Sequence, residues 1–400
     1  MPSSATRLDI YNYPRRLELA LRNLKQNSKV SETNRQRILG FHEIAVAEGL
    51  SKPRLIRYIN ILSRSAELLG STNFTDAKRD DIVSLVAKIE SSSVSDWTKQ
   101  SYKVVLRKFY KWLRHSRGYP REVSWIRVAG RIRGNGILPS ELLTEDDVKR
   151  LGSAATNARD RALVLALYDS ACRIGELLSM RIRDVEFDRR GTVLLVAGKT
   201  GTRRVRVIMS SSAIAGWLNV HPGSGNPDSP LWVDLNHASA LSYEAARSIL
   251  QRLASKVSVG KSVRPHMFRH SRATFLSKHF SDAQMDEYLG WVHGSKMHQI
   301  YYHLTGRDID PTLFAMYGLA TDEEEGPTLK PRPCPRCQEV CDPLVDYCPR
   351  CGSPIDPTRI QEVDKERDWA DSIMTDLLED PETQGFLVRK IREPKLSGSM

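Results

Sequence analysis

The sequence of 400 residues has few cysteines outside one short segment and no long apolar run. Five of its six cysteines lie between Cys334 and Cys351, which excludes a disulfide framework that spans the chain. No apolar stretch approaches the roughly 18 residues that a membrane-spanning helix needs, and the first residues lack the apolar core of a signal peptide. We therefore expect a cytoplasmic protein with no membrane partner.

Acidic residues are too few to balance the basic ones. The chain has 60 Lys and Arg against 48 Asp and Glu, which gives a formal charge of +12 and a pI near 9.4. From Pro357 to the end, seven basic and ten acidic residues give a charge of −3, so the preceding residues carry +15. A basic body with an acidic tail favours a polyanion as the partner of the body. The length predicts roughly two to four domains.

Apolar residues recur at helical spacing from residue 14 to residue 115, which predicts a helical N-terminal domain over 1–115. Its last helix carries an aromatic stripe, made of Trp97, Tyr102, Val105, Phe109 and Trp112, that alternates with Lys99, Lys103, Arg107 and Lys111. The helical period favours core packing of the stripe over a base-stacking surface. The basic residues are candidates for contact with nucleic acid, and a solvated basic face is the alternative.

Glycines, prolines and arginines break the periodicity over residues 116–139, and this composition predicts a basic inter-domain linker that can follow a phosphate backbone. Helical pattern resumes at Thr144, which is expected to cap the next helix. Two β-type runs, residues 192–196 and 203–208, are joined by a turn that contains Lys199 and predict a hairpin. The expected fold is therefore mostly α-helical, with a small β-hairpin or sheet in a second domain.

Two Cys-Pro-Arg-Cys repeats predict a zinc ribbon over residues 330–356. Their ligands are Cys334, Cys337, Cys348 and Cys351. Four thiolates in two C-x2-C pairs complete a tetrahedral zinc site, and a redox or disulfide role is disfavoured in a reducing compartment. Cys341 is surplus to this set. The zinc is expected to be structural, and an acidic helical tail is expected over 357–400.

The segment from Pro265 to Arg272 combines histidine and arginine at helical spacing. In a helix, His266, Arg269 and His270 share one face. Arginine presents a planar cationic fork that fits phosphate oxygens, and histidine exchanges protons near neutral pH. This pairing favours phosphoryl transfer, although a basic helix without catalytic function is the alternative for so short a motif.

Several motifs in a fixed order resemble the catalytic domain of the tyrosine recombinases, the integrase family that includes Xer-type resolvases. These motifs are Ala171-Cys172-Arg173-Ile174-Gly175-Glu176-Leu177, Gly198-Lys199, His266-Met267-Phe268-Arg269-His270, Leu289-Gly290-Trp291 and Ile300-Tyr301-Tyr302-His303. The resemblance implies a catalytic domain over 140–320. The preceding helical segment is similar to the core-binding domain of the same family, which binds DNA.

The resemblance also implies the site residues. Tyr301 is the expected nucleophile, with Tyr302 as the less favoured alternative, and Arg173 and Arg269 are the expected phosphate clamp. Lys199 would donate a proton to the leaving 5′-oxygen.

Three further residues complete the expected site. His266 would act as general base or as a hydrogen-bond partner of the phosphate. Trp291 stands where many relatives have histidine, and its indole N–H can donate a hydrogen bond. His293 is a further candidate for a second imidazole.

The expected activity is cleavage and rejoining of double-stranded DNA at specific sites through a 3′-phosphotyrosyl intermediate, without a cofactor for the chemistry. The resemblance implies a homotetramer on two duplexes. One alternative is a non-cleaving DNA-binding regulator built on a recombinase scaffold. Another is a type IB topoisomerase-like enzyme that nicks and closes DNA without synapsis.

Overall fold

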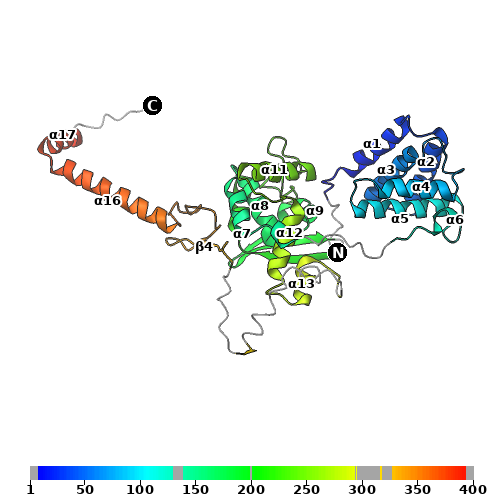
Figure 1. The fold of residues 1–400 in the computed structure, drawn as a ribbon. Coiled ribbons are helices and arrows are strands. Elements are labelled where there is room, and N and C mark those ends of the chain that lie inside the picture. The colour runs from blue at the N-terminus through cyan, green and yellow to red at the C-terminus, as the bar shows by residue number, and fades with distance from the viewer. Residues whose placement is uncertain are drawn as a thin grey trace. The chain divides into compact units, whose positions relative to one another are not determined.

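The computed structural model describes residues 8–128, 138–198, 201–292, 294, 316–317 and 327–392 (Figure 1). The chain separates into two compact units, Met1–Leu138 and Pro139–Met400.

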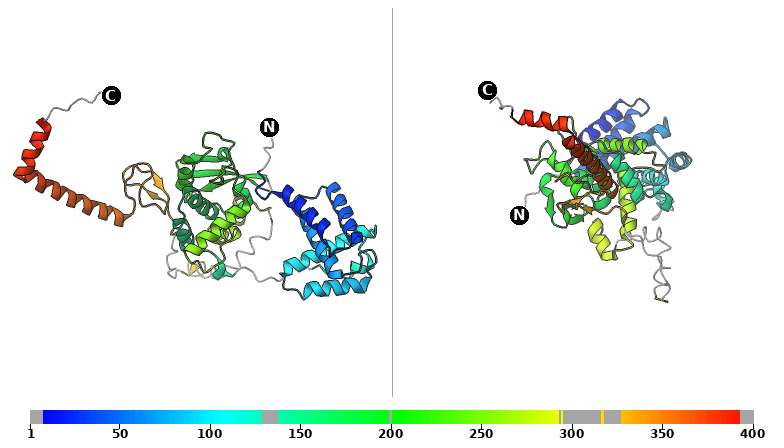
Figure 2. Two further views of the ribbon diagram at one scale, coloured as in Figure 1. Left: turned by 90° about the horizontal axis from the view of Figure 1, so that it is seen from above. Right: turned by 90° about the vertical axis from the view of Figure 1, so that its left-hand side faces the viewer.

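The first unit is a helical bundle (Figure 2). Its helices are α1 (Tyr13–Gln26), α2 (Glu32–Ala47), α3 (Lys52–Leu69), α4 (Arg79–Glu90), α5 (Asp96–Leu113) and the short α6 (Arg121–Ser124). The Ser31 hydroxyl accepts a hydrogen bond from the backbone N–H of Asn34 and caps α2. In the same way, the Ser95 hydroxyl accepts one from the backbone N–H of Thr98 and caps α5. These caps fix where the two helices begin.

Aromatic side chains form much of the core of the bundle. The rings of Phe41 and Phe109 lie 5.3 Å apart in an edge-to-face arrangement, and Phe109 and Val105 are buried. Core packing of the α5 stripe is therefore confirmed for these residues. The prediction of core packing is wrong for Trp97, which is 66% exposed. Trp97 lies in the first turn of α5, outside the part of the helix that packs in the core.

The second unit is organised around one buried helix. Its helices are α7 (Glu145–Ser153), α8 (Ala158–Ser170), α9 (Ile174–Leu178), α10 (Ser211–Asn219), α11 (Tyr243–Lys256), α12 (Pro265–Leu276) and α13 (Asp282–Leu289), with 3-10 turns at Pro139–Glu141 and Ile182–Asp184. Helix α8 is buried on nearly all sides and packs against α7, α10 and α12. Residues that are apolar all round a helix, such as Leu163 to Leu167, favour such a position.

A three-stranded antiparallel sheet lies beside these helices. Its strands are β1 (Val185–Asp188), β2 (Gly191–Gly198) and β3 (Gly201–Val207), in the order β1-β2-β3. The predicted hairpin is confirmed as β2–β3, in which Gly198 pairs with Gly201. Strand β1 was not predicted, because it is only four residues long and two of them are acidic. A mostly helical chain with a small antiparallel sheet is thus confirmed.

A small cysteine-rich segment follows the helices of the second unit. Its strands β4 (Arg332–Pro333) and β5 (Val340–Cys341) pair antiparallel, and its core consists of cysteine side chains and Ile355. The helices α16 (Pro357–Glu379) and α17 (Pro381–Arg392) come next, and Trp369 on α16 is 69% exposed. Among the residues that the structure describes, no helix combines the length and apolar content needed to cross a bilayer.

The cysteine-rich segment (residues 330–356) and the residues just before it contact α7. Glu145 Oε2 accepts the backbone N–H groups of Thr328 and Leu329 at 2.5 and 3.0 Å. Farther along α7, Leu344 packs onto Gly152, where an added Cβ would collide with the Leu344 methyl group. The Leu344 side chain thus occupies the space that a side chain at position 152 would fill.

Candidate catalytic site

The turn between α8 and α9 positions Arg173. Helix α8 ends at Ser170, its C-cap Ala171 has a left-handed φ of 49°, and Arg173 occupies the N-cap position of α9. The Glu176 carboxylate accepts the Arg173 backbone N–H at 3.1 Å and its Nη1 at 2.8 Å. The Arg173 side chain is 37% exposed, whereas Glu176 is buried. The guanidinium is thus anchored from one side and reaches the surface on the other.

Arg269 is held at the junction of three segments. Its buried guanidinium donates from Nη1 to the Ala171 carbonyl and from Nη2 to the Leu289 carbonyl, both at 2.8 Å. It also lies 5.9 Å from the centre of the Trp291 ring. The planar fork therefore has a fixed orientation between the end of α8 and the end of α13.

His266 lies near both arginines. Although His266 is exposed on one side, desolvation by the surrounding protein lowers the pKa of its imidazole, and the positive charges of Arg269 and then Arg173 lower it further. The ring is therefore neutral near pH 7, as a general base or a hydrogen-bond acceptor requires. The structure thus brings together Arg173, His266 and Arg269, with Trp291 packed against Arg269. Lys199, His293, Tyr301 and Tyr302 lie outside the described residues, and their predicted roles stay predictions.

His270 stands one helical turn behind His266, with ring centres 6.1 Å apart. Burial lowers its pKa to about 4, with further contributions from His266 and Arg269, whereas an unfolded histidine has a pKa of about 6.5. Between these values the unfolded chain binds a proton that the folded chain does not, so the free energy of unfolding falls as the pH drops from about 6.5 to about 4.

We expect the urea unfolding midpoint to fall less steeply over this pH range in His270→Gln than in the unmodified protein. Equal slopes for His270→Gln and the unmodified protein would contradict the assignment.

Sequence reasoning missed a buried polar network behind the clamp. Asp169, the penultimate residue of α8, accepts the backbone N–H groups of Ile208 and Ser210 at 2.9 Å and Arg272 Nη2 at 3.3 Å. The Tyr288 hydroxyl donates to the Asp169 carbonyl at 3.1 Å. Arg272 lies three residues after Arg269 in the sequence, and this spacing was the one available signal.

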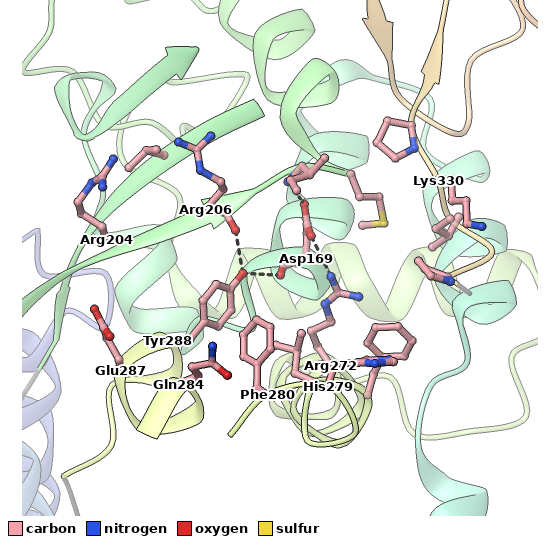
Figure 3. A pocket seen from close by; sticks show the side chains of 18 residues that line it. Asp169, Arg204, Arg206, Arg272, His279, Phe280, Gln284, Glu287, Tyr288 and Lys330 are labelled. Atoms are coloured by element: carbon pink, nitrogen blue, oxygen red, sulfur yellow. Dashed lines mark hydrogen bonds and ion pairs between the residues drawn. The ribbon is translucent and has the colours of Figure 1, made fainter. Parts of the chain in front are cut away.

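This network borders a cavity of about 780 Å³, shown in Figure 3. Its apolar lining includes Phe275, Phe280 and Leu329, and Arg204 and Lys330 also line it. None of Arg173, His266, Arg269 and Trp291 is among its lining residues. The cavity is therefore separate from the candidate catalytic site.

The four predicted ligand cysteines lie close together. The Sγ atoms of Cys334, Cys337, Cys348 and Cys351 are all within 4.8 Å of one another. Two of these Sγ pairs are 3.6 Å apart, close to the roughly 3.8 Å that tetrahedral Zn–S bonds of about 2.3 Å require. Cys341 is outside the group and its thiol donates to the Glu339 carbonyl. The four residues fit a tetrahedral metal ion.

Residues 141–307 match the model of the phage integrase family. The chain is 29% identical over 269 residues to tyrosine recombinase XerA of Pyrococcus horikoshii, which covers 66% of this chain and 87% of XerA. It is 32% identical over 204 residues to tyrosine recombinase XerC of Xanthomonas campestris pv. campestris, which covers 50% of this chain and 61% of XerC.

Solved structures show the same fold. The XerH site-specific recombinase bound to palindromic difH substrate in a post-cleavage complex matches with a TM-score of 0.55 and 18% identity, over 77% of this chain and 97% of XerH. A lambda integrase dimer bound to a COC′ core site matches with a TM-score of 0.55 and 16% identity, over 68% of this chain and 77% of the integrase.

Residues 141–307, which include the arginine–histidine cluster, thus resemble the catalytic domain of the tyrosine recombinases. The protein is an enzyme, a site-specific recombinase of the tyrosine type. The matched relatives favour this function over the non-cleaving regulator and over the topoisomerase-like enzyme.

Proposed function

We propose that the enzyme cleaves and rejoins double-stranded DNA through a 3′-phosphotyrosyl bond to Tyr301. The observation that carries the proposal is that Arg173 and Arg269 both lie close enough to a neutral His266 for their charges to lower its pKa. The tyrosine oxygen attacks the scissile phosphorus, and the 5′-oxygen of the next nucleotide leaves. A second attack by a 5′-hydroxyl reverses the step and regenerates the tyrosine, so that no cofactor is consumed.

Each residue has a distinct role in this reaction. Arg173 and Arg269 stabilise the charge that develops on the non-bridging oxygens. His266 accepts a proton or a hydrogen bond, and Lys199 protonates the leaving oxygen. Trp291 supports the Arg269 guanidinium, against which it packs, and its indole N–H is a further candidate donor to the phosphate.

The assembly is proposed to be a homotetramer on two duplexes. Support comes from solved relatives of the same fold, because lambda integrase forms a tetramer bound to a Holliday junction. Within each chain, residues 1–115 would be the core-binding domain and 116–139 a basic linker, followed by the catalytic domain over 140–320. A cytoplasmic location accords with this DNA substrate.

The test is covalent capture from a library of nicked duplexes with random sequence. A nick near the scissile phosphate lets the short strand diffuse away after cleavage and traps the adduct. We expect recovery of a defined sequence family, and recombination of a plasmid that carries two copies of the recovered site. Relaxation of a supercoiled plasmid without that site would favour the topoisomerase-like activity, and sequence-specific binding without adducts would favour the regulator.

The cysteine-rich segment, residues 330–356, is proposed to be a zinc ribbon with a structural metal. When bound, zinc holds the two C-x2-C pairs together. The contact of Leu344 in this segment with Gly152 of α7 supports a structural role. The helices of 357–400 would form the acidic tail.

We expect about one zinc ion per purified chain. Cys348→Ser should lose the zinc, because three ligands bind it much more weakly, and residues 330–356 should become sensitive to protease. Cys341→Ser is the matched control and should retain the metal. Metal analysis and limited proteolysis measure both effects. Equal zinc content in the two variants would exclude the proposed ligand set.

A further inference from the structure

Arg203 of β3 contacts two other segments of the second unit. Its Nη2 donates to Glu176 Oε2 at 2.9 Å, and its Nε donates to the Tyr288 carbonyl at 3.0 Å. The Arg203 side chain is only 9% exposed. One buried guanidinium thus connects β3 with α9 and with the end of α13.

We propose that Arg203 is a positioning residue for phosphoryl transfer, which holds the Arg173 and Arg269 guanidinium groups in place through their neighbours. The inference rests on the phosphate-clamp role proposed for these two arginines. Arg203 itself does not touch the DNA.

The first connection runs through Glu176. Its Oε1 accepts Arg173 Nη1 at 2.8 Å, and its Oε2 accepts Arg203 Nη2. Burial raises the pKa of the Glu176 carboxyl, but the hydrogen bonds and charges of Arg203 and Arg173 outweigh it, and the pKa is lowered. The carboxylate is therefore ionised and divided between two cations. Without Arg203, the full negative charge would fall on Arg173 and compete with the phosphate for it.

The second connection runs through the end of α13. Arg203 binds the Tyr288 carbonyl, and the next carbonyl along the chain, that of Leu289, accepts Arg269 Nη2 at 2.8 Å. Gly290 follows with φ +64°, and a Cβ there would lie 2.8 Å from Arg203 Nη1. Arg203 therefore packs against the turn that leads to Trp291 and keeps the Leu289 carbonyl aimed at Arg269.

A purely structural role would have different consequences. If Arg203 only held β3 in the fold, its loss would lower stability and DNA affinity together and would affect every substrate equally. If it positions the clamp, its loss should act on the step in which charge develops on the phosphate. The two roles are separable by changing the charge of the phosphate itself.

The test uses the full-length protein and a nicked duplex that carries the library-recovered site. Single-turnover adduct formation is compared for the unmodified protein, Arg203→Met and Arg203→Lys at saturating protein. Arg204→Met is the matched control, because Arg204 is the exposed neighbour on β3. The same duplex with an uncharged methylphosphonate at the scissile position is the second substrate.

On the phosphate substrate we expect Arg203→Met to slow adduct formation about 30- to 100-fold. DNA affinity should stay within about threefold, because the Arg203 side chain is only 9% exposed and offers little surface to a ligand. Arg203→Lys should recover part of the rate, since it restores the charge beside Glu176, and Arg204→Met should react like the unmodified protein. On the methylphosphonate substrate the Arg203→Met defect should shrink to about threefold.

A double-mutant cycle gives an independent readout. In a Glu176→Gln background, Arg203→Met should slow adduct formation less than about fivefold, because the negative charge that Arg203 balances is no longer there. Equal defects on both substrates, or a rate loss that follows losses of melting temperature and affinity, would overturn the inference. Absence of any adduct with the unmodified protein would overturn the proposed function and this inference with it.

Discussion

Tyr301→Phe should abolish the covalent protein–DNA adduct, whereas Tyr302→Phe should retain it. Removal of the Tyr301 hydroxyl eliminates the oxygen that must become bonded to phosphorus. We expect adduct formation on a nicked duplex to fall by at least about 10⁴-fold, to background. A denaturing gel with labelled DNA measures it directly.

Tyr302→Phe is the matched control, because it removes the same atom one position later. Both variants should bind the duplex with unchanged affinity in a native gel. Persistence of the adduct in Tyr301→Phe, together with its loss in Tyr302→Phe, would transfer the role of nucleophile to Tyr302.

Arg269→Ala should produce the second largest loss. The guanidinium is fixed by two backbone carbonyls and lies in the cluster with His266, and a preorganised donor to developing charge contributes about 3 kcal/mol, or 10² to 10³ in rate. We therefore expect single-turnover cleavage to fall by about that factor. The same hydrogen bonds join α12 to the ends of α8 and α13, so the variant can also lose stability. Circular dichroism and thermal unfolding should therefore be measured together with the cleavage rate.

Arg269→Lys and Arg189→Ala provide the comparisons. Lysine keeps the charge but cannot bind both carbonyls at once, so it should recover only a small part of the rate. Arg189 is exposed in the turn between β1 and β2, and its removal should leave cleavage unchanged. If Arg269→Ala cleaved as fast as Arg189→Ala, the proposed clamp would be wrong.

Short-range patterns were enough to predict part of this site. Arg269 lies three residues after His266 on α12, and the spacing alone places both on one face. The hairpin β2–β3 was recognisable because β2 is a run of apolar and β-branched residues, valine recurs at alternate positions in β3, and glycines flank the turn. The thiol positions of the cysteine cluster follow from the spacing of each C-x2-C pair in the same way.

Contacts between residues far apart in the sequence could not be predicted from local sequence patterns. Arg203 binds Glu176, which lies 27 residues away in the sequence, and Arg272 binds Asp169, which lies 103 residues away. Nothing local to Arg203 distinguishes it from Arg204, because strand alternation places one inward and the other outward only once the register is known. The sequence also carried no sign that Leu344 would pack on Gly152.

The contact of Leu344 with α7 affects which truncated forms of the enzyme will fold. A shortened protein that stopped at residue 326 would uncover Gly152 and strip Glu145 of its two amide partners at 328 and 329. An exposed glycine in a helix and the loss of two hydrogen bonds to the Glu145 carboxylate both weaken α7. Fragments made to study the chemistry should therefore extend through residue 356, since the cysteine-rich segment completes the surface of its neighbour.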